Sequence, residues 1–444
     1  MKWFFAVSLC VLFPLSVFGD EFNTERLDNW HQWRGPEANG FAPHADPPLE
    51  WDKDTNIKWK VEVPGDGDAT PIVWGDRIFI LTAIKTDREE ESPPKEIAEA
   101  PGGNPFHVDR PTHYYKFVVM CFDRRTGDVV WERVATELVP HEGHHRDHGF
   151  ASASPVTDGR YVYASFGSRG IYCYDIDGNL QWQRDLGDMS IYRFFGEAIS
   201  PVLYKDTLIV NWDHEGDSFL YALDARTGET KWKVARDEHT SWATPLVVEH
   251  DGTTQIVVNA FGKTRGYAFD SGEVIWECKG QVRAVIPCPV AYQGVVFCMS
   301  GYPGSALLAI SLDATGDVSD SEKVVWSRKR DAPYCPSALL YQDRLYFNKG
   351  NGGILSVLDA STGEPIIKAT RMPGIRGVYA SPVAVEGKIY FTSRDGTTLV
   401  IDDGPKLNVL ATNKLDEPIS ASPALVGKDL FLRSEKHLFR ISDE

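Results

Sequence analysis

The sequence predicts an all-β protein: an eight-bladed β-propeller of four-stranded antiparallel blades, closed by an N-terminal strand that completes the last blade. Three observations support this fold. A short motif recurs eight times, each copy is followed by the same order of hairpin signals, and the last copy is incomplete while an unmatched strand precedes the first. Repeats of roughly 40 to 45 residues are typical of propellers, in which each repeat forms one four-stranded blade.

The recurring motif is a small residue, then Ser or Thr in most copies, then proline and an apolar residue, as in ATPIV and ASPVA. After the first interval, its copies follow one another at 41 to 47 residues. Each copy is expected to begin the innermost strand of a blade. The prolines are Pro71, Pro155, Pro201, Pro245, Pro289, Pro336, Pro382 and Pro423.

The hairpin signals follow each proline in a fixed order. An apolar strand leads to a tight turn such as TDGR or VEGK, and the next strand alternates apolar residues, as in YVYAS and KIYFT. A third strand ends in Asp, a glycine turn follows, and the fourth strand carries a tryptophan. Strands of period two bounded by Gly and Asp turns indicate hairpins.

The junction between the third and fourth strands is the most specific part of the repeat. ALDARTGETKW (222–232) and CFDRRTGDVVW (121–131) share the Asp, the Thr-Gly pair and the final Trp. Asp and Thr cap the turn, Gly supplies a positive φ, and Trp is expected to fill the space between blades. The tryptophans expected in this role are Trp59, Trp131, Trp182, Trp232, Trp276 and Trp326.

This junction resembles the tryptophan-docking repeat of the quinoprotein-like propellers, a group that contains the pyrroloquinoline quinone (PQQ) dehydrogenases and the BamB-like outer-membrane assembly proteins. The resemblance covers essentially the whole mature chain. The N-terminal WHQWRGPEANG, followed by NIKWKVEVPG, is also similar to secreted bacterial PQQ-like propeller proteins.

Ring closure is inferred from the two ends of the propeller. The eighth repeat supplies three strands and then ends at Glu444, without a Trp strand. NIKWKVEVP, before the first repeat, is a Trp strand without a blade, with Trp59 in the expected place. We therefore expect residues near Ile57 to Val63 to complete the last blade, since this pairing removes a free sheet edge.

The N-terminus indicates export. Lys2 precedes an apolar run, small residues stand near Gly19, and acidic residues begin at Asp20, which is the layout of a signal peptide over residues 1–19. We expect an extension over 20–56, a single propeller over 57–444, no membrane-spanning segment in the mature chain, and a monomer in the periplasm or outside the cell. The net charge of −17 argues against nucleic acid as a partner.

The first repeat contains a long insertion. Residues 84–116 are rich in Pro and Glu and show no strand periodicity, so a loop is expected there. By position it belongs on the same face as the His-rich segment His141 to Gly149. It could be a lid, a docking surface or a decoration.

Candidate ligand-binding residues lie just before the Ser/Thr-Pro motifs, because the connections between blades surround one mouth of the channel. In the quinoprotein-like propellers, ligands bind at that mouth. The candidates are His148, Glu197, Trp242, Arg283, Tyr334, Arg376 and Tyr379, with Asp66 and Asp68 nearby.

The histidine cluster HEGHHRDHG admits a metal site, with His144 and His148 as the weak candidates. A polar connection between blades is the favoured alternative, and an anion-binding loop is the third. A disulfide among Cys278, Cys288, Cys298 and Cys335 is left open, since spacing does not fix the pairing.

Three functions follow from these features. The favoured hypothesis is a scaffold that binds a protein or a small ligand at the channel mouth. The second, implied by the resemblance, is an oxidoreductase that uses PQQ and Ca²⁺ to oxidise an alcohol or a sugar, with Glu197, Trp242, Asn259 and Arg283 around the cofactor. The adjacent-cysteine pair of the large PQQ alcohol dehydrogenases is missing from the sequence. The third is a carbohydrate-binding accessory protein.

Overall fold

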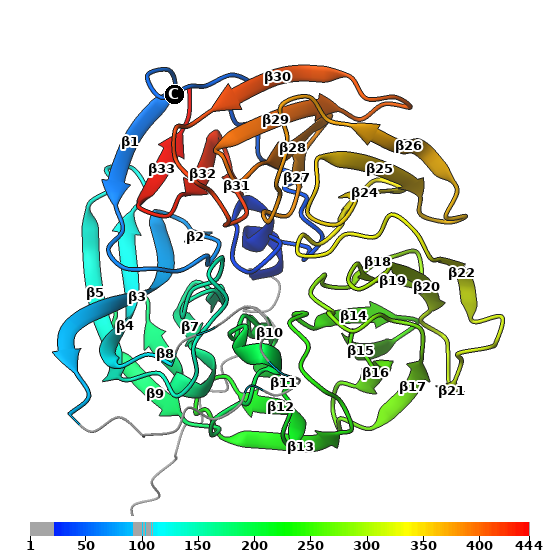
Figure 1. Cartoon of the computed structure of the whole chain (residues 1–444), viewed down its shortest axis with the longest axis horizontal. Coiled ribbons are helices and arrows are strands. Elements are labelled where there is room, and N and C mark those ends of the chain that lie inside the picture. Colours follow the sequence, from blue (N-terminus) through cyan, green and yellow to red (C-terminus); the bar gives the residue numbers. More distant parts are fainter. Residues whose placement is uncertain (1–21, 92–99, 101–102, 104–107, 109, 444) are drawn as a thin grey trace, which may run out of the picture.

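The computed structural model describes residues 22–91, 100, 103, 108 and 110–443. Its sheets form a closed ring of eight blades, and the predicted all-β propeller is confirmed (Figure 1). The predicted signal peptide lies outside the described residues and stays a prediction. Within the described ranges, no helix has the length and apolar character needed to cross a bilayer.

The first four blades are built in chain order, from the inner strand outward. They comprise β2 (Ile72–Trp74), β3 (Arg77–Glu89), β4 (His113–Asp123) and β5 (Val129–Leu138); β6 (Val156–Thr157), β7 (Tyr161–Ser165), β8 (Ile171–Asp175) and β9 (Leu180–Arg184); β10 (Val202–Tyr204), β11 (Thr207–Trp212), β12 (Ser218–Asp224) and β13 (Thr230–Arg236); and β14 (Leu246–His250), β15 (Thr253–Val258), β16 (Thr264–Ala268) and β17 (Val274–Cys278).

The other four blades follow the same order. They comprise β18 (Val290–Tyr292), β19 (Val295–Ser300), β20 (Ala306–Ser311) and β22 (Val324–Arg328); β23 (Leu339–Tyr341), β24 (Arg344–Asn348), β25 (Ile354–Asp359) and β26 (Pro365–Arg371); β27 (Val383–Val385), β28 (Lys388–Thr392), β29 (Thr397–Asp402) and β30 (Val409–Lys414); and β31 (Ala424–Val426), β32 (Asp429–Arg433), β33 (His437–Ile441) and β1 (Ile57–Glu62). The short β21 (Gly316–Asp317) adds to the fourth blade in parallel with β17. Three 3₁₀ turns complete the elements: η1 (Arg26–Asp28), η2 (Gly167–Arg169) and η3 (Tyr192–Phe194).

The last blade closes the ring as predicted. β1 pairs antiparallel with β33, so that Lys60 lies opposite Phe439 and Glu62 opposite His437. The Trp59 indole donates a hydrogen bond of 3.0 Å to the Arg124 carbonyl of the first blade. It packs on Gly127, where a Cβ would lie 2.9 Å from the indole ring. The closing strand therefore joins the last blade and the first.

Tryptophans between the other blades make the same contact, with one variation. The indoles of Trp131, Trp182, Trp232 and Trp326 each donate to a carbonyl that follows the third strand of the next blade. Trp276 donates instead to the Gln255 side chain at 2.8 Å, and the Gln255 amide donates onward to the Leu312 carbonyl at 2.7 Å. Gln255 thus relays the contact between the fourth and fifth blades.

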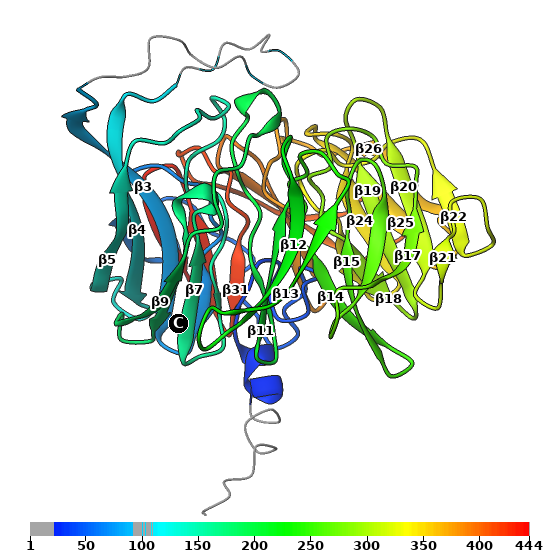
Figure 2. The same ribbon diagram turned by 90° about the horizontal axis from the view of Figure 1, so that it is seen from below.

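The N-terminal extension closes one end of the channel. Trp30 pairs with Val73 on the inner strand of the first blade. The buried Arg34 donates bonds of 2.8 Å to the carbonyls of Pro382 and Ala338, which precede the inner strands of the seventh and sixth blades. Figure 2 shows this segment, in dark blue, below the propeller. We call residues 30–42 the plug.

The region expected as a loop over 84–116 begins and ends as strand. β3 continues to Glu89 and β4 starts at His113, and these two residues pair with each other. The hairpin extends beyond the blade on the face opposite the plug (Figure 2). The sequence pattern missed this stem because its side chains are largely exposed, so they need no apolar alternation.

Two truncations test the closure. A chain that starts at Val63 lacks β1 and leaves the β33 edge unpaired, so we expect a lower Tm and concentration-dependent association in size-exclusion chromatography. A chain that starts at Glu50 lacks the plug but keeps β1, and it should remain monomeric. Equal behaviour of the two chains would contradict a closing role for β1.

Candidate functional site

The Ser or Thr of the repeated motif forms a belt of hydrogen bonds around the channel. The backbone N–H of Ser154 donates to the Ser200 hydroxyl at 2.9 Å, and that of Ser381 donates to the Ser422 hydroxyl at 2.9 Å. Equivalent bonds run from Thr70 to Ser154, from Ser200 to Thr244, from Cys288 to Ser337 and from Ser337 to Ser381. The motif therefore joins the inner strands of neighbouring blades.

Cys288 is the variation in this belt, and it meets the plug. It occupies the position that Ser or Thr holds in other blades, and its Sγ accepts a hydrogen bond from the Trp33 indole at 3.1 Å. All six cysteines of the described residues are free thiols. Trp33 also lines the channel cavity, so the plug supplies an aromatic wall at the closed end.

The channel holds a cavity of about 550 Å³. Small-molecule sites in proteins have about 300–1,000 Å³, so a ligand of moderate size fits. Hydroxyls of the belt line the cavity together with aromatic and charged groups from the connections between blades. The aromatic residues are Trp33, Tyr192, Phe195, Trp242, Tyr302, Tyr334 and Tyr379. The charged or ionisable ones are Asp68, His145, Asp147, His148, Arg193 and Arg283.

The structure brings most of the candidates together. His148, Trp242, Arg283, Tyr334 and Tyr379 all line the cavity. Two candidates do not.

The Glu197 side chain is bound by residues of the second blade and does not line the cavity. Its carboxylate accepts bonds of 2.7 Å from the Ser168 amide and hydroxyl and pairs with Arg169 of η2. Arg376 is exposed and lies outside the cavity wall.

Two arginines dominate one side of the cavity. The Arg283 guanidinium lies 4.3 Å from the centre of the Tyr192 ring, and that of Arg193 lies 4.9 Å from the same ring. Neither forms an ion pair or a hydrogen bond within the part of the chain that the structure describes. Arg193 also has a left-handed backbone, with φ +57° and ψ +20°, a conformation unfavourable for a residue with a side chain. Two positive charges at the cavity therefore have no anionic partner among the described residues.

A clasp of three side chains crosses part of the mouth. Asp147 accepts a bond of 3.1 Å from the Tyr379 hydroxyl and pairs at 3.2 Å with Arg394. Burial opposes ionisation of Asp147, but Arg394 and Tyr379 outweigh it and hold the pKa of the carboxyl below its usual value. The clasp ties the His-rich segment to the loops of the seventh blade.

The histidines of the segment serve mainly as structural links. Burial lowers the pKa of His148 to about 4, and its Nδ1 contacts the Gly149 carbonyl at 2.7 Å. His144 Nδ1 contacts the His145 carbonyl at 2.8 Å, and the rings of His144 and His148 are 6.4 Å apart. Across the described ranges, no group of three or more His, Cys, Asp or Glu is placed to hold a metal ion. The arrangement favours the polar connection over the metal site.

Asp68 is a second charged feature of the cavity. It follows β1 and precedes the inner strand of the first blade. Burial raises the pKa of its carboxyl to about 7, and the negative charge of Asp66 adds to this effect. Its carboxylate has no hydrogen bond or ion pair among the described side chains and backbone groups.

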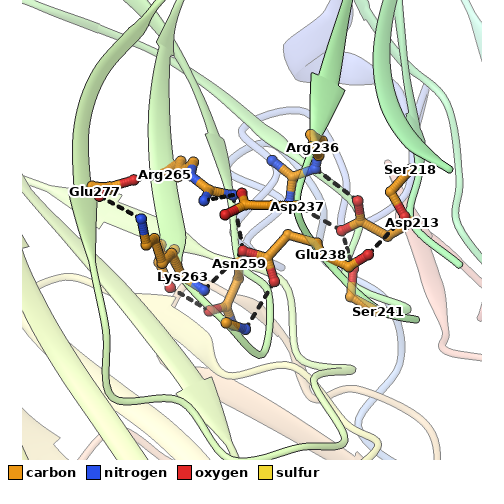
Figure 3. A network of polar contacts seen from close by, with 12 residues as sticks. Asp213, Ser218, Arg236, Asp237, Glu238, Ser241, Asn259, Lys263, Arg265 and Glu277 are labelled. Carbon is orange, nitrogen blue, oxygen red and sulfur yellow. Dashed lines mark hydrogen bonds and ion pairs between the residues drawn. The ribbon is translucent and has the colours of Figure 1, made fainter. Parts of the chain in front are cut away.

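Figure 3 shows a polar network that includes Asp213, Arg236 and Ser241. Arg236 and Asp213 are fully buried and form two contacts, of 2.7 and 3.0 Å. The Ser241 hydroxyl donates to the same carboxylate at 2.8 Å. Ser241 precedes Trp242, so the network fixes a cavity residue.

The network also extends toward the arginine pair. The Thr240 hydroxyl, one residue before Ser241, accepts a bond of 3.0 Å from the Tyr192 backbone. Tyr192 is the ring against which both cavity arginines lie.

Sequence reasoning missed several cavity residues. Trp33 lies in a conspicuous WHQWRG segment, but nothing in that segment indicates that it reaches the channel. Asp147 and Tyr192 lie in connections between blades, which were predicted to surround the mouth of the channel. Only the folded geometry distinguishes these two residues from their neighbours in the connections.

The architecture and cavity define the chain as a PQQ-like eight-bladed propeller. A profile of the family described as outer membrane protein assembly factor BamB matches residues 116–279 and 216–444. The chain belongs to this family.

Solved structures agree with the fold. BamB from Moraxella catarrhalis is 14% identical, covers 81% of this chain and 99% of its own, and gives a TM-score of 0.52. The quinohemoprotein alcohol dehydrogenase of Comamonas testosteroni is 10% identical, covers 95% and 82%, and gives 0.63. The computationally designed Ika8 protein is 12% identical, covers 76% and 98%, and gives 0.50. No curated protein matches the sequence.

The residues suggested for PQQ and Ca²⁺ do not fit that role as a set. Glu197 is held by Arg169 and Ser168. Asn259 is fully buried, donates to the Met299 carbonyl at 2.9 Å and accepts from the Thr264 hydroxyl at 2.8 Å. Trp242 and Arg283 remain available at the cavity, but they supply no oxygen ligand for calcium.

The buried pair of Asp213 and Arg236 should be important for stability. Asp213→Asn leaves the Arg236 charge buried without a carboxylate. We therefore expect the free energy of unfolding, measured by denaturant titration, to fall by about 3–5 kcal/mol. Asp237→Asn is the matched control, because Asp237 is 76% exposed and its partner Arg265 also pairs with Glu238 and Glu277. It should cost less than about 1 kcal/mol. Equal losses would contradict the assigned role.

Asp68 should lower stability at high pH. A carboxyl with a raised pKa favours the folded state at low pH, and this contribution is lost as pH rises through about 7. We therefore expect Asp68→Asn to be more stable than the wild type at pH 8, by about 2 kcal/mol after allowance for solvent screening, and no more stable near pH 4. Thermal unfolding across this range measures the difference, and a constant offset would contradict the raised pKa.

Proposed function

We propose that this protein is a binding protein that holds a small, acidic, ring-bearing compound in its blind central cavity. The observation that carries the proposal is the pair Arg193 and Arg283, which line the cavity without a carboxylate partner. Charged side chains in partly buried sites normally have partners, because burying a lone charge is costly. An anionic ligand would supply the missing partner.

The cavity walls support a ring-shaped ligand. Aromatic side chains surround it from Trp33 at the closed end to Tyr302 and Tyr334 near the mouth. Flat aromatic faces bind aromatic rings by stacking and the apolar faces of sugars by contact. Tyr192 stacks against both arginines and orients their edges. An acid on a ring matches both parts of the site.

The closed end favours binding over passage. The plug blocks the channel, so a ligand enters and leaves through the mouth that the clasp of Asp147, Tyr379 and Arg394 narrows. The apolar run of residues 1–19 supports a place of action outside the cytoplasm, and we propose a monomer there.

A protein-binding scaffold is the second candidate. Its support is membership of a family described as an assembly factor. The β3–β4 hairpin, which projects from the mouth face, would supply a contact surface (Figure 2).

Isothermal titration with p-tolylacetate, a ring with one acid, tests the first proposal. We expect wild-type protein to bind this acid and to bind its neutral amide at least about tenfold more weakly, because only the acid carries a charge for the arginines. Arg283→Gln should lose a similar factor.

Arg376→Gln is the matched control, since it removes an exposed arginine of the mouth face outside the cavity. It should bind p-tolylacetate like the wild type. Equal binding of the acid and the amide, or equal losses in both variants, would contradict the proposal.

A further inference from the structure

The cavity carries opposite charges on opposite sides. Asp68 enters the first blade and Arg283 enters the fifth, and these blades face each other in a ring of eight. Arg193 enters the third blade. All three side chains line the same cavity. Asp68 thus enters the ring opposite Arg283 and two blades away from Arg193.

The protein itself leaves the Asp68 carboxylate without a contact. Four charged groups surround it: Asp66 and Glu435 are acidic, and Arg394 and Arg433 are basic. Arg433 is buried, and its Nη1 donates to the Leu81 carbonyl at 2.8 Å. Arg394 pairs with Asp147 at 3.2 Å. Neither arginine lies within ion-pair distance of Asp68.

We infer that Asp68 binds a protonated amine of the ligand, so that the cavity selects a ring compound with an acid at one end and an amine at the other. This inference rests on the proposed function, because it assumes that the acid end binds to Arg193 and Arg283. It adds the chemical class of the ligand's other end.

The energetics agree with this assignment. A carboxylate removed from water without a partner is unfavourable, and a raised pKa is the expected sign of that cost. An ammonium group would restore the lost interaction as a charge-assisted hydrogen bond. A neutral side chain at position 68 would give a more stable fold at neutral pH than the carboxylate does. The loss of folding stability at Asp68 therefore indicates a role in binding.

The test compares two probes that differ by one amine. 4-(Aminomethyl)phenylacetate carries an acid and an amine at opposite ends of a ring, while p-tolylacetate lacks the amine. By isothermal titration at pH 8, we expect the amine to strengthen binding to the wild type at least about tenfold. Asp68→Asn should abolish this advantage and still bind p-tolylacetate like the wild type.

The pH dependence gives a second readout that needs no variant. Between pH 8 and pH 6 the advantage of the amine should decline, since Asp68 becomes protonated while the amine stays charged. Burial lowers the pKa of His148 to about 4, so this ring stays neutral over this range, and burial also lowers the pKa of His145. The affinity for p-tolylacetate should not decline.

The outcomes separate the two proposals. If p-tolylacetate binds through Arg283 but the amine gives no advantage at pH 8, or an advantage that Asp68→Asn retains, the inference about Asp68 is overturned and the proposed function stands. If neither acid binds, the proposed function fails, and the inference falls with it.

Discussion

Closure of the ring is the constraint on which the rest of the structure depends. A propeller blade has an edge on either side of its sheet, and only a closed ring of packed blades protects its apolar faces on both sides. Here the chain meets this requirement by pairing β1 with β33 and by placing Trp59 against the first blade. The segment before β1 therefore ends at the ring, and residues 30–42 of this segment form the plug.

The plug turns a channel into a cavity. Trp30 attaches it to the first blade and Arg34 to the sixth and seventh blades, and Trp33 then faces the cavity. A hydrogen bond from Trp33 to Cys288 occurs where the hydroxyl belt carries a thiol. The N-terminal segment that leads into the closing strand β1 thus also supplies the plug at the closed end of the proposed binding site.

Charged side chains of the cavity differ from those buried elsewhere in the chain. The blades and the plug satisfy their buried charges: Arg236 pairs with Asp213 and Arg169 with Glu197, while Arg34 and Arg433 donate to backbone carbonyls. The cavity leaves Arg193, Arg283 and Asp68 without such partners. This contrast within one chain is the physical basis for regarding the cavity as a binding site, since unpaired groups cost stability wherever they serve only the fold.

The sequence predicted the fold well and the site in part. The repeated prolines, turn glycines and tryptophans shape a single blade or the contact between adjacent blades. Their spacing in the sequence therefore predicts the ring of blades. The variation at Trp276, where Gln255 relays the bond, has no sequence signal because it depends on the position of a side chain two strands away in the same blade. Glu197 looked like Trp242 from its place in the repeat, and only the structure shows that one turns into the frame and the other into the cavity.

A crystal structure with 4-bromophenylacetate would show directly whether the cavity binds a ring-bearing acid. We expect an anomalous bromine signal inside the cavity, with the carboxylate within hydrogen-bond distance of Arg193 and Arg283. A bromine signal only at the outer surface, or a carboxylate bound away from both arginines, would contradict it.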